Sequence, residues 1–449
     1  MGGWSRATSV STRIIHVVMV WKKGTWHAPK LLSLKRSDRL AGQNRPSDMR
    51  VDTEISGTKA SSPCVWHTPE VVNPPMRVQL NSLTSLRFAA AAMVLAHHLF
   101  SVLLPGSLAA RLTDTGFVGV GFFFALSGFI LMWTYNPALP IRNFYGRRIA
   151  RLIPLHYGTV LVAVVFMLIS ARPVLALPTI ANLALLQAWV PTEGFASHLN
   201  PVSWSLSCEA FFYLCFPYIA RVIARLNRVL VSVTIWISLV AVAALVLSFL
   251  PEVAVPVLYE NPLFRMGGFV LGMLLALSMK NGFRSSVPLP LALALSAFAY
   301  VIAFNSIPVV MSWGWAPARV YGDLVFLPFA LLLITSAATS DLKGTFAWMR
   351  VPVLVKLGEA SFALYLIHYL LLQMFVVAFG TLSGVPGAYM IIVGIGIAII
   401  GLSLVVFQFY EKPAESALRS RLGYPERVQA STPGIDADGT APLNHRTRR

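Results

Sequence analysis

The sequence predicts an all-α, polytopic membrane protein with about ten transmembrane helices. Of its 449 residues, 56% are hydrophobic and only 12% are charged, whereas soluble domains carry about 25% charged residues. Apolar segments long enough to cross a bilayer recur along the chain, and the loops between them alternate between basic and mixed charge. The formal net charge of +18 therefore indicates positive-inside topology rather than binding to nucleic acid.

The two ends of the chain differ in composition from its apolar middle. Residues 1–75 are rich in Ser, Thr, Lys, Arg and Pro without sustained periodicity, which predicts a disordered N-terminal extension, with Met76 as an alternative start. Residues 76–413 form the predicted membrane domain, and residues 414–449 a disordered C-terminal tail. Three cysteines show neither metal-ligand spacing nor a disulfide framework, so no metal site is expected.

Hydropathy and loop charge define the expected spans and their orientation. The spans lie near residues 84–104, 117–135, 149–170, 204–225, 228–250, 262–279, 288–306, 320–338, 361–380 and 388–410. An even number of spans, with Arg and Lys concentrated in alternate loops, places both termini in the cytoplasm. The longest external loop, residues 171–203, contains a candidate interfacial helix over Pro178–Val190.

The first span contains ionisable side chains that packing does not require. Arg87 lies near its start, and His97 and His98 lie near its middle. Eleven residues separate Arg87 from His98, a helix rise of about 16 Å, so His98 is expected near the bilayer midplane if Arg87 lies at one face. An ionisable group there indicates a functional site. The alternative is a histidine that only hydrogen-bonds to a neighbouring helix.

Two arginines mark the start of the third span. Arg148 and Arg151 are three residues apart and therefore share one helix face at the predicted cytoplasmic surface. The planar guanidinium suits bidentate binding of phosphate. The alternative is that these side chains serve membrane topology or bind lipid head groups.

Polar side chains also interrupt three later spans. Trp204 is expected at the outer interface, with Ser207 and Glu209 further into the same helix. An intramembrane carboxylate needs a partner or a water-filled cavity. His368, inside the ninth expected span, is either a helix–helix hydrogen bonder or a site residue, whereas Arg265 is near enough to a span end to reach the interface by snorkelling.

Together these groups offer a base, a carboxylate and anion binders without metal-ligand spacing. Such a set suits transfer of an acyl group from a phosphate-bearing carrier to a hydroxyl. Intramembrane His, Glu and Arg also occur in proton-coupled transporters and exporters of polysaccharide precursors, which is the alternative function. Transporters often contain internal repeats, and this sequence shows none.

At these same residues the chain resembles the acyltransferase 3 family of integral membrane O-acyltransferases. Six motifs in the family's order carry the resemblance: Arg87…His98, Gly119–Phe129, Arg148…Arg151 with Pro154, Trp204–Glu209 with Pro217, Gly358…Ser361…His368, and Glu411–Pro413. Two positions depart from the family's usual polar residues, namely Gly121 and Ala210, and these departures bear on the choice of acceptor.

The resemblance implies an inner-membrane enzyme that takes an acyl group from acyl-CoA, with acetyl-CoA as the expected form, and that binds no other cofactor. The implied acceptor is a hydroxyl of an envelope or extracellular carbohydrate or glycoside, and membrane lipids surround the chain. The expected catalytic residues are His98, as general base, and Glu209. Arg87, Arg148 and Arg151 are expected to bind the donor. Ser207, Trp204 and His368 are expected to contact the acceptor.

Overall fold

The computed structural model describes residues 20–22, 25–27, 79–192, 194–249, 255–312 and 318–423. The chain divides into two units, Met1–Asn73 and Pro74–Arg449. In the first unit, strands β1 (Val20–Lys22) and β2 (Thr25–His27) pair antiparallel. The rest of the predicted N-terminal extension, and the predicted tail beyond residue 423, lie outside the described residues.

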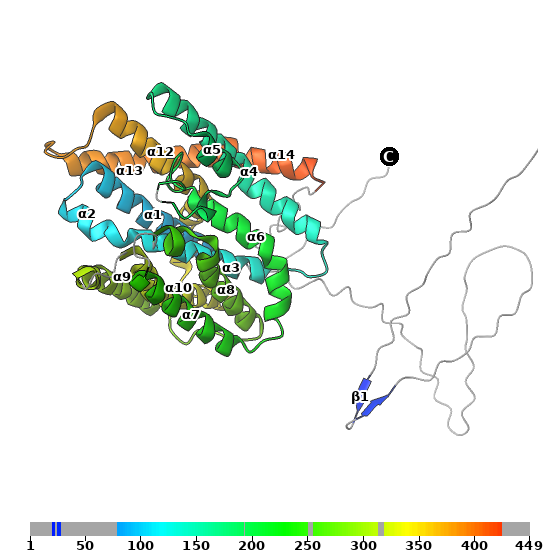
Figure 1. The fold of residues 1–449 in the computed structure, drawn as a ribbon. Helices are drawn as coiled ribbons and strands as arrows, with labels where there is room; N and C mark the ends of the chain where they lie inside the picture. The colour runs from blue at the N-terminus through cyan, green and yellow to red at the C-terminus, as the bar shows by residue number, and fades with distance from the viewer. Residues whose placement is uncertain are drawn as a thin grey trace, which may run out of the picture. The chain divides into compact units, whose positions relative to one another are not determined.

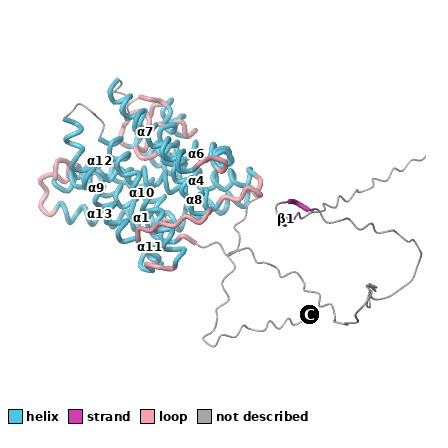
Figure 2. Tube along the Cα trace, turned by 90° about the horizontal axis from the view of Figure 1, so that it is seen from below, coloured by secondary structure: helices cyan, strands magenta, loops and turns pink. Residues whose placement is uncertain are grey.

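Every regular element described in the second unit is a helix, with loops between the helices, which confirms the all-α membrane fold (Figure 2). Nine of its helical segments in the described ranges are long and apolar enough to cross a membrane. They contain helices α1 (Asn81–Leu103), α3 (Val118–Thr134), α4 (Ile141–Ile169), α6 (Trp204–Ile223), α7 (Arg228–Phe249), α8 (Pro262–Lys280), α10 (Ala318–Lys343), α12 (Ser361–Phe379) and α13 (Ala388–Val406). The remaining predicted span, near residues 288–306, corresponds to helix α9 (Leu289–Ser312), whose apolar stretch Leu289–Phe304 is shorter.

Short elements join or extend these helices. They are α2 (Leu108–Thr113), η1 (Asp114–Phe117), α5 (Ala176–Leu183), η2 (Gln187–Trp189), η4 (Val255–Glu260), η5 (Ala347–Arg350), α11 (Pro352–Glu359), η6 (Phe407–Glu411) and α14 (Lys412–Arg421). Helix α14 includes the first residues of the predicted disordered tail, because Glu415 forms ion pairs with Arg151 and Arg419 that hold this segment in place.

Helix α1, which carries Arg87 and both central histidines, has a central position. It lies between α12 and α13 on one side and α9 and α10 on the other (Figure 1).

Helix α3 packs beside α1 and crosses α8 at two glycines. A Cβ atom added at Gly128 would lie 1.9 Å from the carbonyl oxygen of Phe269, and one at Gly272 would lie 1.9 Å from that of Ala125. Small residues thus permit the close backbone approach that is typical of membrane helix pairs.

A buried ion pair joins α8 to α10 and corrects the expectation for Arg265. Its side chain is 6% exposed and does not snorkel, because its Nη1 donates to Oδ2 of Asp323 at 2.5 Å. Burial of two charges requires such mutual compensation. The carboxylate of Asp323 also fills the space beside Gly121, where an added Cβ would lie 3.0 Å from Oδ1.

Candidate functional site

Two cavities meet inside the membrane unit. The first, here called the arginine cavity, has a volume of about 120 Å³ and is lined by Arg87, Arg148 and Arg151. The second, here called the histidine cavity, has a volume of about 420 Å³ and is lined by His97 and His98 among others. Val120 of α3 and Tyr365 of α12 line both cavities. A reaction at this shared wall could therefore draw on groups from either side.

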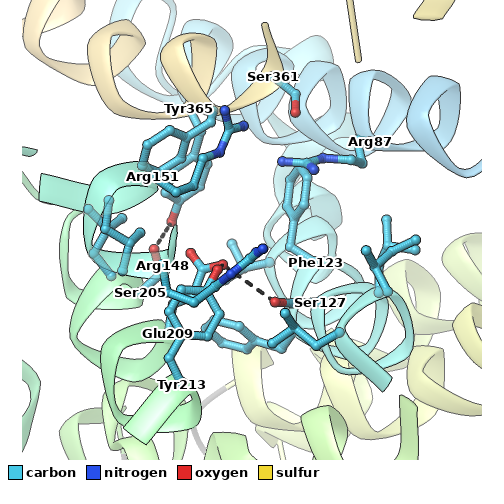
Figure 3. A pocket seen from close by; sticks show the side chains of 18 residues that line it. Arg87, Phe123, Ser127, Arg148, Arg151, Ser205, Glu209, Tyr213, Ser361 and Tyr365 are labelled. Carbon is cyan, nitrogen blue, oxygen red and sulfur yellow. Dashed lines mark hydrogen bonds between the residues drawn. The ribbon is translucent and has the colours of Figure 1, made fainter. Parts of the chain in front are cut away.

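Three guanidinium groups converge on the arginine cavity. Arg87 extends from α1, while Arg148 and Arg151 extend from one face of α4 (Figure 3). The guanidinium of Arg148 lies over the ring of Tyr213, at 5.7 Å from its centroid. The structure thus brings together three arginines that the sequence singled out separately. Such a cluster can bind a polyanion.

The three arginines differ in their carboxylate partners. Nη1 of Arg151 lies 2.8 Å from Oε1 of Glu411 and 3.1 Å from Oε2 of Glu415. In the described ranges, no salt bridge joins Arg87 or Arg148 to a carboxylate. An incoming anion therefore meets two cations whose charge is not already matched by such a bridge. Sequence reasoning missed Glu411 as the ion-pair partner of Arg151. Its only signal was its place in the closing Glu-Lys-Pro motif.

Glu209 lines the arginine cavity. The hydroxyl of Tyr213 donates to its Oε1, and that of Ser127 donates to the same oxygen at 3.4 Å (Figure 3). Ser207 lines neither cavity, because its buried hydroxyl donates to the carbonyl of Leu185 at 2.6 Å. Residues two apart on a helix point about 200° apart, which is why the structure separates these two side chains.

Tyr365 forms a fixed part of the shared wall. Ser205 donates a hydrogen bond to its hydroxyl at 2.8 Å, and the hydroxyl donates to the carbonyl of Val202 at 3.0 Å (Figure 3). Ser205 lies in the first turn of α6 and Val202 just before that helix, so the ring links α12 to the start of α6 at the junction of the cavities. Sequence reasoning did not single out Tyr365, although it lies within the Gly358…Ser361…His368 motif.

His98, which lines the histidine cavity, contacts His368, which was expected to meet the acceptor but lines neither cavity. Nδ1 of His98 lies 2.9 Å from Nε2 of His368, so the second histidine is both a helix–helix hydrogen bonder and a neighbour of the candidate base. His97 also lines the cavity, with its Nδ1 3.7 Å from Oδ1 of Asp114. Both histidines therefore line this cavity, although adjacent positions on a helix point about 100° apart.

The remaining lining of the histidine cavity is aromatic and acidic. Trp204, Tyr259 and Tyr369 present rings to it, and Asp114 and Glu260 add carboxylates. The edge of the Tyr369 ring meets His98, with centroids 4.8 Å apart. Trp204 therefore lines the same cavity as His98, the candidate base. Rings beside polar groups can accommodate a ligand with both apolar faces and hydroxyls.

The loop that precedes α6 closes one side of the histidine cavity and is held by buried amides. Asn200 donates to the carbonyl of Leu366 on α12 at 2.9 Å, and Asn182 donates to the hydroxyl of Ser203 at 3.0 Å. Further out, Nε2 of His198 accepts from the backbone N–H of Leu175 at 3.1 Å. Partial burial lowers the pKa of His198, which favours the neutral ring that this acceptor role requires.

The predicted interfacial helix is shorter than expected. Helix α5 covers Ala176–Leu183, and a turn of 3₁₀-helix, η2, follows. Leu177 and Ile180 are exposed, whereas Asn182 is buried.

Across the described residues, no group of three His, Cys, Asp or Glu side chains is arranged to hold a metal ion. The site therefore offers guanidinium, imidazole, carboxylate and hydroxyl groups.

A family model and several known proteins are similar to this chain. The acyltransferase 3 family model, described as an acyltransferase domain, matches residues 80–407. The acyltransferase MdmB of Streptomyces mycarofaciens is 34% identical over 327 residues, which are 67% of this chain and 81% of the relative. The peptidoglycan O-acetyltransferase OatA of Listeria monocytogenes is 24% identical over 323 residues, 65% of this chain and 49% of that protein.

A further relative is the O-acetyltransferase OatA of Staphylococcus aureus, which is 25% identical over 318 residues, 65% of this chain and 50% of the relative. The chain thus spans about half the length of the OatA proteins that it matches. No solved structure matches the chain.

Proposed function

The chain belongs to the acyltransferase 3 family, and from that membership we propose that it transfers an acyl group, expected to be acetyl, from acyl-CoA to a hydroxyl of an envelope or extracellular carbohydrate or glycoside. Membership decides between the two classes that the sequence left open, in favour of a membrane O-acyltransferase over a transporter. The observation that carries the proposal is the shared wall at Val120 and Tyr365, which separates a cationic cavity from one that holds a histidine base.

The arginine cavity suits the donor. The phosphates of coenzyme A are anionic, and Arg87 and Arg148 offer planar donors that form paired hydrogen bonds with phosphate oxygens. Arg151 adds to the positive potential while its own charge is compensated by Glu411. The thioester end of the donor would extend toward Tyr365. Donor binding is thus assigned to Arg87, Arg148 and Arg151, and acyl-CoA is a co-substrate rather than a bound cofactor.

His98 would perform the proton transfer. Its ring removes the proton from the acceptor hydroxyl, and the oxygen attacks the thioester carbonyl carbon. The carbon–sulfur bond then breaks, the ester remains on the acceptor, and the proton on His98 passes to the departing thiolate. No net charge is created, and His98 returns to its neutral form. Imidazole suits this exchange because it gains and loses a proton near neutral pH.

The two cavities would open toward opposite membrane faces. Arg87 near the start of α1 and Arg148 near the start of α4 line the same cavity, so these two helix starts lie on one side of the unit. The basic loops belong to that side, which we place in the cytoplasm of a cell with an inner membrane. Both termini then lie in the cytoplasm, and the histidine cavity receives the acceptor from the outer face.

The acceptor class follows from the lining of the histidine cavity. Rings of Trp204, Tyr259 and Tyr369 can pack against the apolar faces of sugar rings, while His98 meets a hydroxyl. The Listeria relative is named as a peptidoglycan O-acetyltransferase, and the glycan strands of peptidoglycan carry sugar hydroxyls. These features support a carbohydrate or glycoside, with Trp204 as a contact. Ser207 is withdrawn from the proposed acceptor contacts because it lines neither cavity.

The test is acyl transfer by the purified protein in lipid nanodiscs. Acetyl-CoA labelled in its acetyl group would be supplied with monosaccharides, glycosides and cell-wall fragments, and both free CoA and labelled ester would be measured. We expect equal amounts of the two, with both lost in His98→Ala at matched protein levels. Movement of an acceptor across the membrane without CoA release would refute the proposal.

A further inference from the structure

His368 occupies a position from which it can set the protonation pattern of the candidate base. It lies on α12, is 1% exposed, and contacts α1 through His98. Its Nδ1 lies 3.0 Å from the carbonyl oxygen of Leu364, one turn earlier in the same helix. A carbonyl oxygen only accepts hydrogen bonds, so Nδ1 of His368 must carry the hydrogen.

This first hydrogen bond determines the second. A neutral imidazole with hydrogen on Nδ1 has a lone pair on Nε2. Nε2 of His368 faces Nδ1 of His98 at 2.9 Å, so Nδ1 of His98 must be the donor. Within the described ranges, no carboxylate forms a salt bridge with His368, and an unbalanced charge buried there would be costly. The neutral form is therefore the one that fits the site.

The hydrogen on Nδ1 of His98 decides which nitrogen of the ring can act as the base. With hydrogen on Nδ1, the neutral ring of His98 carries its lone pair on Nε2, and only that nitrogen can take a proton from a hydroxyl. We propose that His368 is a positioning residue that fixes this tautomer and the ring orientation of His98. The inference rests on the proposed function of His98 as general base.

The arrangement resembles hydrolase triads in its logic but differs in charge. There a carboxylate orients the histidine and also stabilises its protonated form. Here the orienting group is a neutral imidazole held by the backbone of α12. His368 accepts the hydrogen bond from His98 and so orients its ring, but it brings no negative charge. Its contribution is therefore geometric. A side chain that keeps the acceptor should keep most of the activity.

The test compares two replacements of His368 in nanodiscs. His368→Gln places an amide oxygen close to the position of Nε2 and keeps an acceptor for His98. His368→Leu has similar bulk without an acceptor. We expect His368→Leu to lower kcat by about 100-fold or more, with the KM values for donor and acceptor unchanged. We expect His368→Gln to stay within about tenfold of the unmodified protein.

A matched control and a spectroscopic measurement separate positioning from folding. Gln373→Leu makes a polar-to-apolar change on the same helix outside both cavity linings, and we expect ordinary kcat and abundance. In ¹⁵N-histidine NMR spectra, His98 should show protonated Nδ1 and unprotonated Nε2, and this pattern should be lost in His368→Leu.

The outcomes distinguish the inference from the function on which it rests. Equal kcat in His368→Leu and His368→Gln, or a His98 ring protonated on Nε2 in the unmodified protein, would overturn the positioning role. Full activity in His98→Ala would instead overturn the proposed base. A loss in His368→Leu that appears only as lower membrane abundance, with kcat per molecule preserved, would also count against positioning.

Discussion

Replacement of Arg148 by lysine should weaken acyl-CoA binding without loss of the protein. Lysine keeps the charge but removes the planar fork, and with it one hydrogen bond to a charged phosphate. Such a bond contributes about 1.5–3 kcal/mol, and each 1.4 kcal/mol corresponds to about a tenfold change in affinity. The apparent KM for acyl-CoA should therefore rise by about 10- to 100-fold. The stacking of Arg148 on Tyr213 should also weaken.

The assay is CoA release at varied acyl-CoA concentration, with protein amount fixed by immunoblot. The matched control is Arg142→Lys, which makes the same change at an exposed position at the start of the same helix. We expect no change in its KM. Arg151→Lys should raise the KM for acyl-CoA as well, because Arg151 lines the same cavity, and it should also lower thermal stability, because Arg151 is bound to Glu411 and Glu415. An unchanged KM in Arg148→Lys, or the same rise in Arg142→Lys, would refute the assignment of donor binding.

Three further predictions follow from the same contacts. His98→Ala should lower acyl transfer by about 10²- to 10⁴-fold at matched membrane levels, whereas His97→Ala should be milder, because Nδ1 of His97 faces Asp114 while His98 contacts His368; the reverse order would contradict the base assignment. Gly121→Asp should lower thermal stability because the new carboxylate meets that of Asp323, and Asp323→Asn in that background should restore it by leaving one acid for the buried arginine. A chain that starts at Met76 should insert and stay active, as fractionation and CoA release would show.

The membrane helices could be predicted because hydropathy acts locally. Nine expected spans reappear as helices of spanning length, since twenty apolar residues in lipid must satisfy their backbone hydrogen bonds internally. Helix α4 begins at Ile141, before the expected residue 149, because its charged first turns are helical too. Hydropathy detects the apolar part of a helix and not its polar extension.

The members of the site could be predicted more readily than their pairing. Arg87, His98 and His368 stood out because an ionisable group in an apolar span is costly without a purpose. Contacts between distant segments have no such local signal. Glu411 meets Arg151, and Asp323 meets Arg265, only after the helices pack. Glu209 was found as a site residue, but its direction depends on how α6 rotates against α3 and α4.

Separation of the two cavities resolves a conflict between the needs of donor and base. The donor needs clustered positive charge, while His98 must hold a proton briefly, and nearby cations oppose that protonated form. At an effective dielectric constant of about 20, two like charges 4 Å apart repel by about 4 kcal/mol. Across the rise of about 16 Å between Arg87 and His98, the repulsion falls to about 1 kcal/mol. Under the proposed function, this distance would let the arginines bind the donor on one side of the wall at Tyr365 while His98 acts as a base on the other.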